Sequence, residues 1–448
     1  MTRVLGVDGA VRFTGSDALR SVFPVTDFAS ASLGAAGAAM ADLVDTQYGA
    51  APPVSVDRRL ASLWFGWSLR PDGWTLPPAW DPVAGDYRTQ DGWIRLHTNA
   101  PHHRDAALAV LGVPAEREAV ARAVANWQAD ALEAAVVAKN GCAAAMRSAT
   151  AWAQHQQGVA VAAEPLIAIA RTDAVAQPVW AFTPERPLAG IRVLDLTRIL
   201  AGPIATRFLA GFGAEVLRID PIGWEEPGVA PEVTVGKRCA RLDLRDASGR
   251  EALVALLREA DVLVHGYRAD ALEKLGLGTE ARRHIRPGLV DVCLNAYGWS
   301  GPWQYRRGFD SLVQMSAGIA DAGMRLFGAD KPTPLPVQAL DHATGYLMAA
   351  AAVNGLARRL RDGAGFNARL SLARSALLLQ SVAPARPGSA MDPARDADYP
   401  TLPEATSSGP AHRLLAPVSV DGAPLRWDSP ATDLGSASAT WQRSTARS

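Results

Sequence analysis

The chain has 448 residues, which is enough for two or three domains with buried cores. Its 45 basic and 45 acidic residues balance, so no global field favours nucleic acid or an anionic membrane. The first residues hold no apolar run of the signal-peptide kind, and no apolar segment reaches membrane-spanning length. We therefore expect a soluble, cytoplasmic protein with no nucleic-acid or membrane partner.

The first part of the chain shares a pattern with a later part. Each of two segments has a Pro-Val pair, an aspartate and a small-residue helix: FPVTDFASASLGAAGAAM (23–40) and LPVQALDHATGYLMAAAAVN (335–354). The aspartates, Asp27 and Asp341, are 314 residues apart, and a further pair, Ser55 and Ser371, is 316 apart. We interpret residues 1–80 as a degenerate repeat, although Ala-rich helices also align by chance. We expect Asp27 to be an inert helix cap.

Residues 81–185 form a different unit. The segment 86–99 alternates like a strand around an Asp-Gly turn, and the Ala-rich stretch after it is typical of successive helices. His97, His102 and His103 lie here, but no carboxylate or cysteine completes a ligand spacing. We predict no metal, and place these histidines at a surface or an interface. The chain's three cysteines are widely scattered, which argues against a disulfide framework or a zinc site.

The most informative pattern spans residues 187–220. It predicts a strand (IRVLDL), an Ala-Gly-Pro turn, an amphipathic helix and a second strand (EVLRID), which together make a βαβ unit. Gly202 lets the backbone approach a ligand closely, so we expect a phosphate-bearing ligand near Ala201 and Gly202. The dinucleotide fingerprint needs three glycines and only one is present, so Asp220 alone does not support a nicotinamide or flavin site. A βαβ unit with no ligand at this turn stays an alternative.

Strands and helices continue to alternate as far as residue 363, which predicts a parallel sheet. The predicted strands are 236–244, 261–267 and 289–298, and the predicted helices are 247–260, 269–278, 308–320 and 341–363. We therefore predict an α/β fold: a Rossmann-like parallel sheet with flanking helices, plus a smaller α+β domain. The sheet domain covers residues 186–385, and residues 386–448, rich in Pro, Ala, Ser and Asp, form a loop-rich tail.

These segments resemble CoA-transferase family III, the group that includes formyl-CoA and carnitine CoA-transferases and alpha-methylacyl-CoA racemase. The resemblance runs in unbroken order over about 187–380, through GKRCARLDL, DVLVHGYRADALEKLGLG, YGWSGPW, RRGFDSLVQMSAG and DHATGYLMAAAAVNGLARR. Segment 86–170 is similar to the smaller domain that follows the α/β part in the family but precedes it here. The resemblance implies the family III fold with a rearranged N-terminal half, either as a permuted or fused enzyme or with a regulatory vestige.

The resemblance also implies roles for individual residues. Asp341, in a D-x-x-x-G context, matches the transferases' nucleophile. A helix N-terminus favours negative charge, so we expect this carboxylate to be held ionised and to attack an acyl-CoA thioester; a simple N-cap is the alternative. The implied coenzyme A contacts are Arg198, Leu200, Ala201, Gly202, Gly266, Tyr267, Lys274, Leu275, Tyr297 and Gly298. Leu200, Gly266 and Tyr297 replace a glutamine, an asparagine and a lysine of the formyl-CoA branch, which leaves the substrate open.

The activity implied is transfer of CoA from an acyl-CoA to a free carboxylic acid through an aspartyl anhydride and an aspartyl thioester. Coenzyme A and acyl-CoA are then substrates, with no permanently bound cofactor. The family forms interlocked dimers, so a homodimer is expected. A racemase or isomerase is the alternative, but Phe309 stands where the racemase branch has a histidine and cannot carry a proton, although His342 could compensate. A non-catalytic CoA-binding protein is the third possibility.

Overall fold

A computed structural model describes residues 1–448 except 8, 175–179, 181–182, 383–390 and 443–448. The predicted α/β fold is confirmed. Seven strands form the central sheet in the order β10-β9-β8-β11-β12-β13-β7. The first six are parallel, and β7 is antiparallel to β13. The strands are β7 (Ala168–Ala174), β8 (Arg192–Leu196), β9 (Glu215–Asp220), β10 (Lys237–Arg241), β11 (Val262–His265), β12 (Val290–Asn295) and β13 (Ala364–Ser371).

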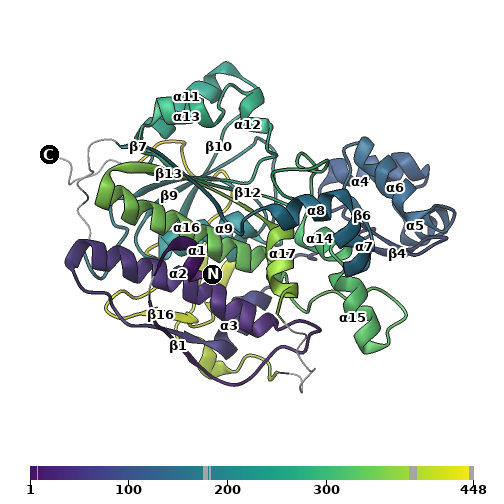
Figure 1. Ribbon diagram of the computed structural model, residues 1–448, viewed down its shortest axis with the longest axis horizontal. Coiled ribbons are helices and arrows are strands. Elements are labelled where there is room, and N and C mark those ends of the chain that lie inside the picture. The colour runs from purple at the N-terminus through teal and green to yellow at the C-terminus, as the bar shows by residue number, and fades with distance from the viewer. Residues whose placement is uncertain (8, 175–179, 181–182, 383–390, 443–448) are drawn as a thin grey trace.

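Helices cover both faces of this sheet (Figure 1). One face carries α9 (Ala201–Gly211) and α16 (Ala339–Asp362), and the other carries α11 (Ala247–Glu259), α12 (Ala271–Lys274) and α13 (Thr279–Ile285). Alternate strand residues enter separate cores: Val193 packs with the α9 and α16 side, whereas Leu194 packs with the α11 side. This two-sided burial explains why the strands read as nearly continuous apolar runs.

The N-terminal segment adds a further layer below α16. Helix α2 (Val25–Tyr48) packs along α16, and a small sheet of β1 (Val11–Thr14), β2 (Val54–Asp57) and β16 (Val418–Val420) covers it. Helix α3 (Arg58–Gly66) follows β2, as α17 (Leu372–Gln380) follows β13. The two segments therefore share one order of elements: a 24-residue helix, a strand and a nine-residue helix.

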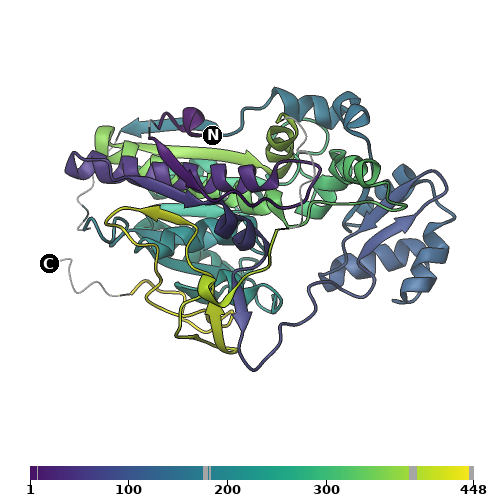
Figure 2. The same cartoon turned by 90° about the horizontal axis from the view of Figure 1, so that it is seen from below.

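A small unit forms a lobe at one end of the molecule (Figure 2). The predicted hairpin of β4 (Gly85–Arg88) and β5 (Trp93–Leu96) is present, with β6 (Ala143–Ala145) as a third strand. Its helices are α4 (Pro101–Leu111), α5 (Arg117–Val124) and α6 (Ala129–Ala138). The next two helices, α7 (Ala149–Gln154) and α8 (Gln156–Ala163), pack on the main core through Trp152 and Val161. The lobe packs on α14 (Asp310–Ser316) and α15 (Ile319–Phe327). We predicted one helix over 308–320, but Gly318 lies at φ 86° and separates these two.

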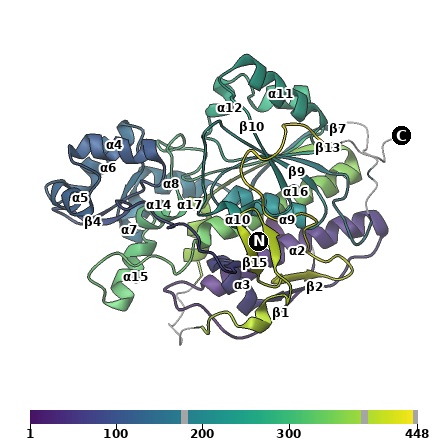
Figure 3. The same cartoon turned by 180° about the vertical axis from the view of Figure 1, so that it is seen from behind.

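The C-terminal segment returns to the N-terminal part of the chain (Figure 3). Its strands β14 (Glu404–Thr406) and β15 (Gly409–Arg413) form a sheet with β3 (Leu69–Pro71), while β16 pairs with β2. Sequence reasoning predicted a loop-rich tail and none of these strands, because strands of three to five residues carry little periodic signal. The predicted boundary between residues 385 and 386 lies outside the described residues. Short helices α1 (Thr2–Leu5), α10 (Ala230–Val233) and η1 (Asp396–Asp398) complete the elements.

None of the helices in the described part of the chain has both the length and the hydropathy needed to cross a membrane.

Candidate active site

A cavity of about 400 Å³ lies beyond the carboxyl ends of β8, β11 and β12. Strands are added to one side of β8 up to β10 and to its other side from β11 onward, so the strand order reverses between β8 and β11, and open α/β sheets bind ligands at that point. The lining combines residues of the sheet loops, the start of α16 and the small lobe: His102, His103, Leu196, Thr197, Arg198, Ile199, Leu200, Ala201, Gly202, Trp224, Gly266, Tyr267, Arg268, Ala271, Leu294, Asn295, Ala296, Arg306, Arg307, Gly308, Phe309, Asp341 and Leu372.

Asp341 is the acidic residue in this lining. It is the third residue of α16, whose N-terminus has no side-chain cap. The Asp341 backbone N–H donates to Asp310 Oδ2 at 2.9 Å, and the Gln314 amide donates to Asp310 Oδ1 at 2.5 Å. Gln314 in turn accepts the backbone N–H of Leu335 at 2.7 Å. The Asp341 side chain is thus partly exposed to the cavity, above a fully buried, hydrogen-bonded Asp310.

The environment of Asp341 opposes its ionisation. Burial, and next the neighbouring Asp310 carboxyl, raise the pKa of Asp341 well above its ordinary value. Burial also raises the pKa of Asp310 to about 6. We expected the helix N-terminus to hold Asp341 ionised, and that prediction is wrong in direction, because desolvation and a like charge outweigh the helix dipole. A carboxylate with a raised pKa is the more basic, and so the stronger, nucleophile once it ionises.

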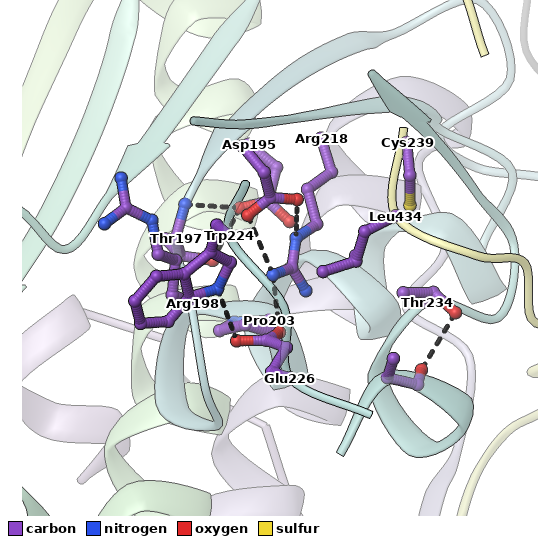
Figure 4. A network of polar contacts seen from close by, with 12 residues as sticks. Asp195, Thr197, Arg198, Pro203, Arg218, Trp224, Glu226, Thr234, Cys239 and Leu434 are labelled. Carbon is purple, nitrogen blue, oxygen red and sulfur yellow. Dashed lines mark hydrogen bonds and ion pairs between the residues drawn. The ribbon is translucent and has the colours of Figure 1, made fainter. Parts of the chain in front are cut away.

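A buried network shapes the loop after β8 (Figure 4). Ile199 lies at φ 66°, a region that a β-branched residue rarely adopts. Its N–H donates to Glu226 Oε2 at 3.0 Å, and the same oxygen accepts the Trp224 indole N–H at 3.1 Å. Arg218, fully buried, holds the other Glu226 oxygen at 2.5 Å. Glu226 thus links the strained loop to the sheet and supplies a partner for the displaced Ile199 amide.

The same loop presents Arg198 to the cavity between two aromatic rings. Its guanidinium carbon lies 5.0 Å from the centre of the Trp224 ring and 5.1 Å from that of Tyr267. It also donates to the Tyr267 hydroxyl at 3.1 Å. Arg198 is therefore oriented by residues of the loops after β9 and β11, and cation–π contact leaves its remaining donors available.

A second part of the network fixes the start of α9. Lys237 is fully buried, and its ammonium donates to Asp195 at 3.1 Å, to the Pro203 carbonyl at 2.8 Å and to Thr206 at 2.6 Å. The α9 N-terminus has no side-chain cap, so the Ala201 and Gly202 amides at the cavity wall are not claimed by a capping residue. Sequence reasoning missed Lys237 and Glu226, whose partners lie on other strands and loops.

Seven of the predicted site residues lie together in the cavity wall: Arg198, Leu200, Ala201, Gly202, Gly266, Tyr267 and Asp341. The other four do not line it. Lys274 is exposed and pairs with Asp270 at 2.5 Å, and Leu275 follows it at the end of α12. Tyr297 is buried with its hydroxyl on Ser316 at 3.2 Å, and Gly298 lies against Glu164. His342, considered as a substitute base, stacks on Phe65 away from the lining.

The small lobe contributes a wall that sequence reasoning did not assign to the site. His102 and His103 line the cavity, and His97 stacks flat on Phe309 with ring centres 3.8 Å apart. Of the two expected locations, His97 and His103 occupy the interface, since they are 6% and 5% exposed. Burial lowers the pKa of both to about 3. Among the described residues no group of His, Cys, Asp or Glu could hold a metal ion.

Comparison with known proteins matches part of the chain to one family. The model of "CoA-transferase family III" matches residues 188–404. The match confirms the resemblance to CoA-transferase family III for this part of the chain, which we call the family III segment. The family III segment includes β8 to β13 and both Asp310 and Asp341, so it supplies every cavity residue except the two histidines of the small lobe.

Similar proteins cover more of the chain but not all of it. An "Acyl-CoA transferase" of Gibberella moniliformis is 30% identical over 313 residues, 64% of this chain and 54% of that protein. A "Succinyl-CoA:glutarate CoA-transferase" of Mus musculus is 33% identical over 195 residues, 40% of this chain and 44% of that protein. A crystal structure of a Mycobacterium tuberculosis hypothetical protein shows 32% identity, with a TM-score of 0.40 over 44% of this chain and 58% of that one. The chain spans about half the length of the curated relatives it matches.

Proposed function

We propose that this protein transfers coenzyme A from an acyl-CoA to a free carboxylic acid, with Asp341 as the nucleophile. The observation that carries this is the position of Asp341: it is the single carboxyl group among the described residues of the cavity wall, and in the described part of the chain it forms no ion pair. Facing it are the uncapped start of α9 and the Arg198 loop, which suit phosphate and oxyanion groups. The match of residues 188–404 to CoA-transferase family III supports the same activity.

The chemistry conserves every group. The Asp341 carboxylate attacks the thioester carbonyl and expels coenzyme A as a thiolate, which leaves an aspartyl–acyl anhydride. The thiolate attacks the aspartyl carbonyl and releases the donor acid, so that an aspartyl-CoA thioester remains. The acceptor carboxylate attacks this thioester to give a new anhydride and the thiolate. The thiolate then attacks the acceptor carbonyl, which forms the product acyl-CoA and restores Asp341.

Different residues of the cavity wall have different roles in this reaction. Free N–H groups at the start of α9 stabilise the oxyanion of each tetrahedral intermediate. Arg198, held over Tyr267, offers charged donors to a phosphate of coenzyme A. Asp310 fixes the Asp341 backbone and, through its charge, keeps the reacting carboxylate basic. The low pKa of His103 makes it a weak base for removing an α-proton, which favours transfer over racemisation.

Trapping the intermediate tests the proposal. The full chain is incubated with a panel of acyl-CoA donors and pooled carboxylic acids, and new acyl-CoA products are measured by mass spectrometry. Hydroxylamine added with the donor alone converts an aspartyl thioester to a hydroxamate, which peptide mapping should place on Asp341. Asp341→Ala is the negative control and Asp27→Ala the matched control.

The outcomes separate three activities. A hydroxamate on Asp341 together with new acyl-CoA supports the transferase. Deuterium uptake at the α-carbon without a trapped adduct supports the racemase or isomerase instead. Binding of acyl-CoA with neither product nor adduct would leave a CoA-binding protein. The cytoplasmic location and the homodimer expected from the sequence stay predictions, and analytical ultracentrifugation measures the second.

A further inference from the structure

A second cavity, of about 500 Å³, lies between the loop from α12 to α13 and the edge of the central sheet. It shares no lining residue with the active-site cavity. The polar side chains on its floor are Asn367 and Arg369 of β13. Their register partners on the edge strand β7 are Ala170 and Ala168, whose short side chains leave the space beside them open.

Asn367 is a buried amide without a partner. The residue is only 5% exposed, and its side chain forms no hydrogen bond in the described part of the chain. Unlike the unpaired amide nitrogen of Asn354, this amide is not sealed from solvent, so it opens to the cavity that it lines. On the neighbouring strand its register partner Asp291 is held by Arg282 at 2.7 Å. Because buried polar groups are normally hydrogen-bonded, the free amide points to a ligand.

Two charges of opposite sign in the same wall also lack a counter-charge. Neither the Arg369 guanidinium nor the Glu273 carboxylate forms an ion pair with any described residue, and they are not paired with each other. Glu273 accepts the Thr279 N–H at 3.4 Å. Arg283, by contrast, is neutralised by Glu280 at 2.8 Å. Arg369 and Glu273 are therefore the cavity charges that remain available to a ligand.

We propose that this cavity is a second binding site and that its ligand is a small zwitterion of the amino-acid class. Arg369 and Asn367 lie two residues apart on one face of β13, and both donate to the ligand carboxylate. The ligand ammonium group donates to Glu273 on α12. A zwitterion satisfies both free charges, whereas Glu273 repels a simple anion and Arg369 repels a simple amine.

Binding measurements on the full chain test this assignment. The proteinogenic L-amino acids are screened one at a time by thermal shift, and those that raise Tm are measured by calorimetry. We expect at least one to bind about tenfold more tightly than the amine that lacks its carboxylate and the acid that lacks its ammonium group. Arg369→Met and Glu273→Gln, both at exposed residues, should each weaken binding by about tenfold. Arg283→Met, the matched control in the same wall, should leave the affinity within about twofold.

Asn367→Leu distinguishes a ligand contact from a purely structural role. It removes an amide that has no partner in the free protein, so Tm without ligand should not fall, while binding weakens by about tenfold. A lower Tm with unchanged affinity would show that the amide serves the fold and would overturn the proposal.

Three further outcomes also overturn it: no amino acid binds, the simple acid binds as tightly as the amino acid, or free coenzyme A competes for the site. The last would assign the cavity to the coenzyme A site. None of these results bears on the proposed role of Asp341, because that carboxyl lies in the other cavity.

Discussion

Helices α2 and α16 share one local pattern, but the aspartates near their N-termini lie in different surroundings. In each, an aspartate is the third of 24 residues, the C-terminus is a left-handed glycine, and a strand and a nine-residue helix follow. The N-caps of the short helices, Asp57 and Ser371, are 314 residues apart, as are Asp27 and Asp341. In the structure the counterpart of Ser371 is therefore Asp57 rather than Ser55, and both pairs of equivalent residues are separated by the same 314 residues.

The surroundings of the two aspartates differ. Asp27 is 57% exposed and forms an ion pair with Arg58 at 2.6 Å, whereas Asp341 faces a cavity and borders Asp310. The strand after α2 lies in a three-stranded sheet, and the strand after α16 lies in the seven-stranded sheet that builds the cavity. A carboxylate at the start of a helix is therefore not sufficient for an active site. The loops that pack around Asp341 form the cavity, and Asp27 has no such loops.

Replacing each aspartate gives the largest expected contrast. Asp341→Ala removes the proposed nucleophile and should lower transferase kcat by about 10³-fold or more. Asp27→Ala removes an exposed ion pair and should leave kcat within about twofold. Product formation measured under identical conditions checks both. Comparable losses in the two variants would contradict the division between the helices.

Substituting the residue four positions after each aspartate tests whether the close packing of α16 on α9 is what makes the surroundings of Asp341 differ from those of Asp27. This residue is Gly345 in α16 and Ala31 in α2. A Cβ at Gly345 would overlap the Ala201 carbonyl oxygen and press on Ile204, so Gly345→Ala should separate α16 from α9. We expect a loss of about 1–3 kcal/mol in unfolding free energy and of about tenfold or more in kcat/KM.

Ala31→Gly is the reciprocal change. It should cost only about 1 kcal/mol, through helix propensity, and leave kcat/KM unchanged. Chemical denaturation and steady-state kinetics measure the two quantities separately. If Gly345→Ala kept full activity, close approach of α16 to the Ala201 loop would not be required for the site.

The loop after β8, which has no counterpart near Asp27, can be destabilised without a change to Asp341. Glu226→Gln keeps the shape of the side chain but removes the charge that holds Arg218 and the Ile199 amide. We expect a rise in KM for the CoA thioester of about tenfold with a smaller change in kcat, because the loop orients Arg198 rather than the reacting carboxyl. An unchanged KM would show that the strained Ile199 conformation persists without its anionic partner.

The sequence predicted those features that depend only on residues close together along the chain. The βαβ unit, the alternation of strands and helices, Asp341 and the loop from Arg198 to Gly202 were all readable from periodicity and motif. The wall formed by His102 and His103 was not, because it depends on how the lobe docks against Phe309. A local signal did exist: two arginines directly precede the Gly-Phe-Asp motif, and both line the cavity.

The sign of the Asp341 pKa shift could not be predicted from the helix alone. The dipole acts through local geometry, while desolvation depends on the whole cavity and on Asp310, 31 residues earlier. Lys274 failed to reach the cavity for a related reason, since Asp270 one turn earlier neutralises it on an exposed surface. Local rules place charges on elements, but tertiary packing decides which of them remain unpaired.

The pH dependence of transfer provides a finer test. The proposed attack requires ionised Asp341, so activity should fall as the pH drops through its raised pKa. Above about pH 6 Asp310 is ionised and opposes that ionisation. Asp310→Asn removes the like charge and should move the acidic limb of kcat/KM to lower pH. The Asp27→Asn profile should superimpose on that of the unsubstituted protein; a limb that stays in place in Asp310→Asn would contradict the coupling.

The smallest expected effect concerns stability, and its sign differs between the two helices. The pKa of Asp341 is higher in the folded than in the unfolded chain, so the folded state loses stability as the pH rises through the interval between the two. Asp341→Asn removes this penalty and should raise the unfolding free energy at neutral pH by on the order of 1 kcal/mol, with no gain at about pH 3, where both states are protonated. Asp27→Asn should instead lose about 0–1 kcal/mol, since it breaks only an exposed ion pair. Thermal melting at both pH values measures these changes. A stabilised Asp27→Asn together with a destabilised Asp341→Asn would show that Asp27, and not Asp341, is the aspartate whose ionised form destabilises the fold.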